Sequence, residues 1–297
     1  MIRRLMVNVI AVALVGCAAP TRADDTHDVS ATPTTQKDAR AEMVGAASDG
    51  PRSVAEKAVD EHGKTAKEGT PAARHWSYSG GSGPAHWGEL EAEYRSCKTG
   101  TMQSPVDLVG ATNAGLPKIE FDYRISPLEI VNNGHTVQIN VAKGSSIVID
   151  GERFELLQFH FHTPSEHLVA GKRFPMEMHF VHKNTAGQLA VIGVMVEGGA
   201  KNIAFQEIVP HLPKQAGKPR KVADVAINPR DLLPGDQRYY RYMGSLTTPP
   251  CTEGVNWYVL KQPVEVDDRQ ITTAATVIGR NARPPLPRNH RLLMSGN

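Results

Sequence analysis

Three histidines stand at a spacing that could bind a metal ion. Residues 158–162 read Gln-Phe-His-Phe-His, and residues 176–182 read Met-Glu-Met-His-Phe-Val-His. Because residues two apart on a β-strand project from the same face, His160 and His162 would point one way and the phenylalanines beside them the other way. His179 could converge with them from a neighbouring strand. Three neutral imidazoles with one open position form the ligand set of a catalytic zinc ion.

The same histidines also fit a role without zinc. A polar strand face whose histidines are hydrogen-bonded would give the same pattern, and copper and nickel also accept imidazole ligands. The chain has no CxxC motif, which argues against structural zinc, and its spacing differs from that of the helical HExxH motif. Under the zinc hypothesis, Gln158 could orient His160 and Glu177 could orient His179, because each pair shares a strand face.

A rigid loop downstream carries two adjacent threonines before a pair of prolines. Residues 245–254 read Ser-Leu-Thr-Thr-Pro-Pro-Cys-Thr-Glu-Gly. Consecutive prolines fix the backbone and end regular structure, so Thr247 and Thr248 could order an oxygen bound to a metal. By itself the segment also fits an ordinary turn before a strand that begins at Val255.

Short alternating segments around the histidines predict a mainly β domain. Apolar and polar residues alternate in segments 119–123, 128–131, 136–141, 146–149, 154–162, 176–182, 189–196 and 255–260. Turn residues such as Asn133-Gly134 separate these segments, as in a mainly antiparallel sheet built from hairpins. Helical pattern is sparse: Asn202 is the expected cap of a short helix carrying Ile203, Phe205, Ile208 and Val209, and residues 269–278 form another.

The composition narrows the class of protein. The 297 residues include 33 Lys and Arg against 31 Asp and Glu, a net charge of +2. This near balance excludes a generally basic nucleic-acid-binding protein. No apolar run reaches the roughly 20 residues that span a bilayer.

The first residues predict export. A positive start, Met-Ile-Arg-Arg, precedes an apolar stretch over residues 5–15 that ends in Leu-Val-Gly-Cys. This layout fits a bacterial signal peptide over residues 1–16, and its end resembles a lipobox, after which Cys17 takes a lipid. We therefore expect the protein in the periplasm or cell envelope, where the lipid would anchor it to a membrane without a transmembrane helix. A plain secretory signal cut near Ala23 is the alternative.

A tether and one domain are expected after the signal. Residues 17–71 lack aromatic residues and have few large aliphatic ones, so they cannot bury enough surface to fold alone and are predicted to be a flexible tether. A small helical module over residues 53–67 is the alternative. Aromatic residues begin at Trp76, and we expect a single domain over residues 72–297.

The cysteine count agrees with export. The chain has three cysteines, and an even pair, Cys97 and Cys251, remains if Cys17 is lipidated. An oxidising compartment would let this pair form a disulfide, the alternative being two buried free thiols.

Nine segments together carry a family resemblance: HWSY, GPAHWGEL, CKTGTMQSPVDL, NNGHTVQI, QFHFHTPSEH, EMHFVHKN, LAVIGVMVEGG, GSLTTPPCTEGVNWYVL and RNARPPLP. They occur in this order from His75 to about Leu293, over roughly three-quarters of the chain. A single HxH motif would be weak evidence, but the ordered set is specific. On these segments the chain resembles the alpha-class carbonic anhydrases, and most closely their exported bacterial members.

The resemblance implies a fold, a reaction and a metal. The fold is mainly β: a single domain with a central, twisted, mostly antiparallel sheet of about ten strands, and short helices and loops outside it. The reaction is the reversible hydration of carbon dioxide to bicarbonate and a proton, with one zinc ion per chain. The implied zinc ligands are His160, His162 and His179, with Gln158 and Glu177 as their outer partners.

The resemblance also assigns roles around the metal. Thr247 would hydrogen-bond the zinc-bound hydroxide and be held by Glu166, and His135 would carry protons to solvent with Tyr78 and Asn133 in the water chain beside it. The implied carbon dioxide pocket consists of Val181, Val191, Leu246 and Trp257, with Thr248 lining the same cavity. Cys97 and Cys251 match the disulfide positions of the bacterial members, and Asn281 and Arg283 match positions with a structural role.

Competing functions follow from the same residues. A non-catalytic surface lipoprotein that binds zinc or another ligand is the alternative to the enzyme. The enzyme could also hydrolyse activated esters as a side reaction. Expected partners are carbon dioxide and bicarbonate, and a membrane through the lipid; no nucleic acid is expected, and the sequence makes no prediction of oligomeric state.

Overall fold

The computed structural model describes residues 75–296. The predicted signal peptide, the lipid site at Cys17, the tether and the helical alternative over residues 53–67 lie outside the described residues and stay predictions. None of the helices within residues 75–296 is long and apolar enough to cross a membrane.

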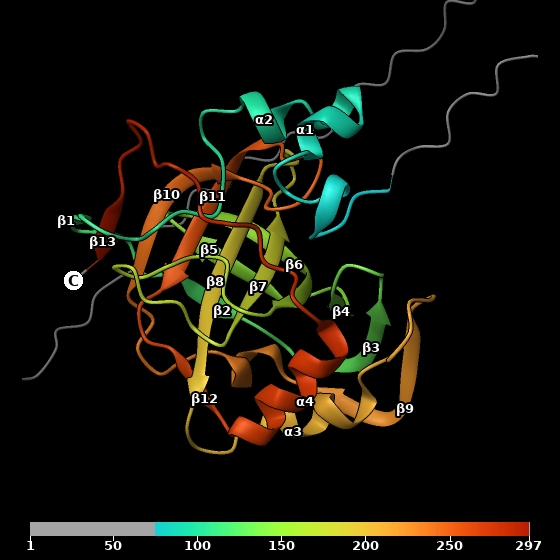
Figure 1. Cartoon of the computed structure of the whole chain (residues 1–297). Coiled ribbons are helices and arrows are strands. Elements are labelled where there is room, and N and C mark those ends of the chain that lie inside the picture. The colour runs from blue at the N-terminus through green and yellow to red at the C-terminus, as the bar shows by residue number, and fades with distance from the viewer. Residues whose placement is uncertain (1–74, 297) are drawn as a thin grey trace, which may run out of the picture. The chain divides into compact units, whose positions relative to one another are not determined.

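One large twisted sheet organises this part of the chain (Figure 1). Ten strands form a continuous path in the order β1-β13-β10-β11-β8-β7-β6-β4-β3-β9, and β2, β5 and β12 pair beside it. Every pairing is antiparallel except β1 with β13, β11 with β8 and β12 with β8. The predicted fold class, a mostly antiparallel sheet of about ten strands with peripheral helices, is therefore confirmed.

The strands are β1 (Thr112–Ala114), β2 (Glu120–Asp122), β3 (Ser126–Asn132), β4 (Val137–Asn140), β5 (Ser146–Ile149), β6 (Glu152–His162), β7 (Met176–Lys183), β8 (Leu189–Gly198), β9 (Arg220–Ile227), β10 (Tyr239–Ser245), β11 (Glu253–Leu260), β12 (Val264–Val266) and β13 (Met294–Gly296). The helices are α1 (Trp87–Leu90), α2 (Ser96–Thr99), α3 (Ile203–Ile208) and α4 (Asp268–Ile278), with 3-10 turns at Gly80–Ser82, Ala92–Tyr94, Val209–His211 and Pro229–Leu232.

Each of the eight segments predicted to be strands overlaps a strand, although segments 119–123 and 136–141 extend one residue beyond theirs at each end, and five further strands were not predicted. Three of these, β1, β12 and β13, have three residues each, too few to show a period of two. Strand β10 reads Tyr-Tyr-Arg-Tyr-Met-Gly-Ser and buries residues on both faces, so it does not alternate. Strand β9 is a mostly exposed strand at the end of the sheet, where its register against β3 shifts.

Two hydrophobic clusters pack on the sheet. The larger one joins the inward side chains of β3 to β8 to Phe205 and Ile208 of α3 and to Ile271 of α4. The smaller one gathers Val191 and Trp257 with their neighbours. Consecutive residues of β8 alternate between the two clusters, as expected for a strand buried on both faces.

The two predicted helices occur as α3 and α4. The Asn202 side chain accepts a hydrogen bond from the Phe205 N–H at 3.0 Å, which caps α3 as expected. Ile203 was expected with the apolar side of this helix, but it lies at the first helical position and is 79% exposed. The helices α1 and α2 have four residues each and leave no periodic signal.

A β-bulge in β6 decides which face its histidines occupy. Phe154 and Leu156 are buried in the larger cluster, and so is Phe159. On a regular strand over residues 154–162, Phe154 and Leu156 would share a face with His160 instead. The register against β7 shifts around Leu157, which turns His160 onto the face opposite the cluster. The predicted strand is present, but this bulge interrupts its expected alternation.

The predicted disulfide between Cys97 and Cys251 is confirmed. It joins α2 to the loop that follows β10, and Cys251 is fully buried. The Cys251 N–H also donates to the Thr248 carbonyl at 2.8 Å, so the loop is closed within itself as well as bonded to α2.

Removal of this bridge should lower the stability of the domain. The bridged cysteines lie 154 residues apart, and the chain-entropy argument gives up to about 5 kcal/mol for such a loop. We expect Cys97→Ser combined with Cys251→Ser to reduce the free energy of unfolding in urea by about 2–5 kcal/mol. Reductant should weaken the wild type and leave the double variant unchanged. Equal stability of the two proteins without reductant would contradict a stabilising bridge.

Candidate functional site

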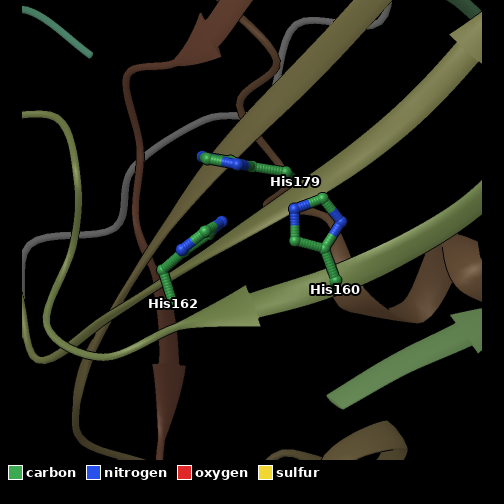
Figure 2. Close-up of side chains that lie close together, drawn as sticks. All are labelled: His160, His162 and His179. Carbon is green, nitrogen blue, oxygen red and sulfur yellow. The ribbon is translucent and has the colours of Figure 1, made fainter. Parts of the chain in front are cut away.

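Strands β6 and β7 bring the three histidines together. In their antiparallel register His160 lies opposite His179, and His162 lies opposite Glu177. Directly opposed residues project from the same face, so the three imidazoles meet above one side of the sheet (Figure 2). One ring nitrogen from each histidine lies within 4.8 Å of the other two.

One nitrogen of each imidazole ring contacts a neighbouring group that holds the ring in place. His160 Nδ1 is 2.9 Å from Gln158 Oε1, and His179 Nε2 is 2.8 Å from Glu177 Oε1. Nε2 of His160 and Nδ1 of His179 take no part in these contacts, and the latter is 3.9 Å from Glu166 Oε2. The structure therefore places both sequence-predicted orienting residues next to their histidines.

His162 is oriented by a group that the sequence did not suggest. Its Nδ1 is 2.8 Å from the backbone carbonyl of Asn281. Its Nε2 is buried and has no hydrogen-bond partner among residues 75–296. A buried polar atom of this kind is costly unless something binds it, and a metal ion in front of the three rings would do so.

Burial keeps the three imidazoles neutral. It lowers the pKa of His160 well below the ordinary histidine value, and it lowers the pKa of His162 to about 4. Burial also lowers the pKa of His179, although Glu177 opposes this effect. Neutral rings offer a lone pair, which is the form that binds a metal ion.

The donor set fits a divalent ion that prefers imidazole. In the described part of the chain, no further His, Cys, Asp or Glu joins these three at the same spacing. A tetrahedral ion held by His160, His162 and His179 would therefore keep one position open, which is typical of catalytic rather than structural sites.

A buried carboxyl group lies beside the imidazoles. Glu166 is fully buried, its Oε1 accepts a hydrogen bond from the Arg283 N–H at 2.8 Å, and its Oε2 is 3.5 Å from His162 Nε2. Burial is the largest effect on this group and raises its pKa to about 7, against the lowering effects of His179 and of the Thr247 hydroxyl. Thr247 is itself buried in the loop after β10.

A cavity of about 150 Å³ opens onto His160 and His162. Its lining contains several residues that the sequence predicted for the site: Tyr78, Asn133, His135, Gln158 and Thr248. The lining also includes residues that were not predicted, namely Trp76, Thr136 and Gln138.

His135 lies in the turn between β3 and β4. Asn133 Oδ1 accepts hydrogen bonds from the N–H groups of His135 and Thr136, both at 2.9 Å, and so shapes the turn. The His135 ring stacks on Trp76 with centroids 3.5 Å apart and on His75 with centroids 4.8 Å apart. Burial and the neighbouring His75 lower the pKa of His135 below the ordinary histidine value.

The predicted apolar residues form a row beside the imidazoles. Val181 of β7 lies opposite Val191 of β8, which in turn lies opposite Trp257 of β11. Leu246 packs in the same cluster. The Trp257 ring centroid is 4.8 Å from that of His179, so the row reaches the metal-binding face, although none of its members lines the 150 Å³ cavity.

Sequence reasoning missed a fourth histidine at this site, His167, which is fully buried. His167 Nδ1 is 2.7 Å from Glu177 Oε1, the atom that also contacts His179. His167 lies in the irregular segment after β6, where no strand alternation marks it. Its only sequence signal was its place at the end of the QFHFHTPSEH segment.

Comparisons with known proteins point to one family. The family described as eukaryotic-type carbonic anhydrase matches residues 82–297. A carbonic anhydrase from Pectobacterium atrosepticum is 43% identical over 225 residues, which cover 74% of this chain and 90% of that protein.

Solved structures agree with this match. A hyperthermostable carbonic anhydrase from a hydrothermal vent chimney has a TM-score of 0.72 at 49% identity, covering 75% of this chain and 100% of that one. The alpha-carbonic anhydrase from Thermovibrio ammonificans, solved with the inhibitor sulfanilamide, has a TM-score of 0.71 at 45% identity, covering 74% and 98%. Sequence, fold and the converging imidazoles agree, and the chain belongs to the eukaryotic-type, alpha-class carbonic anhydrase family, whose members are lyases.

Proposed function

We propose that this chain catalyses the reversible hydration of carbon dioxide to bicarbonate and a proton, with one zinc ion held by His160, His162 and His179. The observation that supports the proposal most is the engagement of one nitrogen of each ring, which turns the other nitrogen towards a shared point. An open set of three neutral imidazoles suits catalytic zinc, and its family membership favours zinc over copper or nickel.

The metal and the chain would divide the chemistry between them. When bound, zinc acts as a Lewis acid and lowers the pKa of its water to about 7, an established property of carbonic anhydrases rather than a result of this structure. Glu166, whose Oε1 accepts the N–H of Arg283, would accept a hydrogen bond from the Thr247 hydroxyl, which also lowers the pKa of this carboxyl group. With its own proton directed to Glu166, the Thr247 oxygen could only accept a hydrogen bond, and this would orient the attacking oxygen towards the substrate.

The apolar row would hold the substrate. Carbon dioxide has no net charge and gains little from hydrogen bonds, so a surface formed by Val181, Val191, Leu246 and Trp257 suits it. Thr248 lines the 150 Å³ cavity and would supply a polar group there. Bicarbonate, by contrast, is charged. Water solvates it better than this apolar surface does, so it would leave the site.

The proton released by each turnover needs a carrier. His135 lines the same cavity as two of the proposed metal ligands, and Tyr78 and Asn133 line it as well. Histidine titrates closer to neutral pH than any other side chain, so His135 suits transfer between the cavity and the buffer.

Zinc content and hydration should depend on the histidine cluster. We expect the purified wild type to contain one zinc ion per chain and to lose carbon dioxide hydration when a chelator removes it. His162→Ala should lose both zinc and activity, because two nitrogens cannot replace three. The half-exposed His86 lies outside the cluster, and His86→Ala should keep both properties.

Metal analysis together with stopped-flow hydration checks this expectation. Zinc bound at full occupancy without hydration would contradict the enzymatic proposal and favour the non-catalytic zinc-binding alternative. Zinc retained by His162→Ala would contradict the ligand assignment.

The carrier role predicts a dependence on buffer. We expect His135→Ala to slow turnover about tenfold in dilute buffer, because proton transfer becomes limiting, and free imidazole to restore it. Hydration measured in concentrated buffer should change little. Full turnover of the variant in dilute buffer would show that another group carries the proton.

We further propose that the protein is exported and anchored to a membrane by a lipid at Cys17. The signal-like start and the disulfide support export, since disulfides persist in oxidising compartments.

Anchoring can be tested by cell fractionation. We expect Cys17→Ser to move the protein from the membrane fraction to the soluble one, because its lipid acceptor is lost. Hydration activity per molecule should be unaffected. Unchanged membrane association would contradict lipid anchoring.

A further inference from the structure

Glu177 accepts hydrogen bonds from two histidines at one oxygen atom. Its Oε1 is 2.8 Å from His179 Nε2 and 2.7 Å from His167 Nδ1. Its Oε2 accepts the N–H groups of Glu166 and His167, both at 2.8 Å. Glu177 and His167 are fully buried and His179 is 1% exposed, so water does not compete for these contacts.

These contacts decide where the protons lie. A carboxylate has about four acceptor positions, and Glu177 uses two of them for backbone N–H groups, which can only donate. The remaining two face the imidazoles, so His179 carries its proton on Nε2 and His167 carries one on Nδ1. The lone pair of His179 is thereby placed on Nδ1, the nitrogen left for a metal ion.

Hydroxyl groups complete the chain behind His167. Its Nε2 is 2.6 Å from the Tyr242 hydroxyl, which is 2.8 Å from Ser104 Oγ. Ser104 Oγ accepts the Ser245 N–H at 3.1 Å. A neutral His167 with its proton on Nδ1 accepts from Tyr242, and Tyr242 accepts from Ser104, so every member of the chain is satisfied.

His167, Glu177 and His179 could themselves be taken for a second metal site, since they also lie within 4.8 Å of one another. The distances argue against it. Two ligand atoms on a tetrahedral ion with bonds of roughly 2.0–2.1 Å stand about 3.3 Å apart. The observed separations of 2.7 and 2.8 Å, both to the same oxygen, are those of hydrogen bonds.

We propose that His167 is a positioning residue for the metal. Through Glu177 it fixes the tautomer and the orientation of His179, and Tyr242 fixes the tautomer of His167 in turn. The inference deepens the proposed function, on which it rests for the identity of the metal. It assigns a role to a histidine that contacts neither the metal nor the substrate.

The same fold contains a matched control. His182 is fully buried, its Nε2 is 2.8 Å from the Tyr123 hydroxyl, and its Nδ1 is 3.3 Å from the Ala190 carbonyl. This pair repeats the contact between histidine and tyrosine, but it leads to a backbone carbonyl instead of Glu177.

The first experiment compares Tyr242→Phe with Tyr123→Phe. Both changes delete a buried hydroxyl beside a histidine and should destabilise the metal-free protein similarly in urea. Only Tyr242→Phe should speed the release of zinc to a chelator, by about tenfold, as is typical when an outer partner of a metal ligand is lost. Equal release rates for these two variants and the wild type would overturn the proposal.

A second pair of variants removes the histidine itself. The amide nitrogen of His167→Asn can still donate to Glu177, whereas His167→Leu cannot. We expect zinc release within about threefold of wild type for the first variant and about 10–100-fold faster for the second. In proton NMR spectra of the wild type, the His167 Nδ1–H should also be protected from exchange with solvent. Its signal should weaken in Tyr242→Phe. Equal release from His167→Asn and His167→Leu would overturn the positioning role even if Tyr242→Phe failed to fold.

Failure of this inference differs from failure of the proposed function. A wild type that binds zinc but does not hydrate carbon dioxide contradicts the function, and the release rates still decide the role of His167. A wild type that hydrates carbon dioxide while all variants release zinc equally contradicts the inference alone. A wild type that binds no zinc overturns both.

Discussion

The register between β6 and β7 is the constraint on which the site depends. A slip of one residue would turn His179 away from His160 and into the core, because side chains alternate with a period of two. The opposite face of the same strands resists that slip. Phe159 and Phe180 face each other there, fully buried, with ring centroids 5.1 Å apart, and exposing either would cost about 1.5–3 kcal/mol. The hydrophobic face therefore fixes the arrangement of the polar one.

The polar face needs support from a distant segment. The carbonyl of Asn281 orients His162, its side chain donates to the carbonyl of His135 at 3.1 Å, and the nearby Arg283 N–H holds Glu166. These contacts join residues 117 to 146 positions apart in the sequence. A buried carboxyl group without such partners would cost several kcal/mol, so the segment allows the site to be both polar and dry.

Local patterns predicted the part of the site that lies on strands. Period-two alternation alone places Gln158, His160 and His162 on one face, and the structure brings them together with His179. The bulge at Leu157 was missed. Apolar residues are spaced two apart on each side of it, so each half looks like part of one regular strand. The contacts of Asn281 and His167 could not be predicted from the residues alone, because both lie in irregular segments where no period links them to the strands.

Rows of side chains across the sheet explain how a metal-binding surface and an apolar surface come to lie side by side. His179 and Val181 lie two residues apart on β7, so they share a face and stand in neighbouring rows. The first row pairs His179 with His160, and the second continues from Val181 through Val191 to Trp257. A reaction between water and an uncharged molecule needs an electrophilic centre and a dry surface in contact. One step of two residues along a strand supplies that contact.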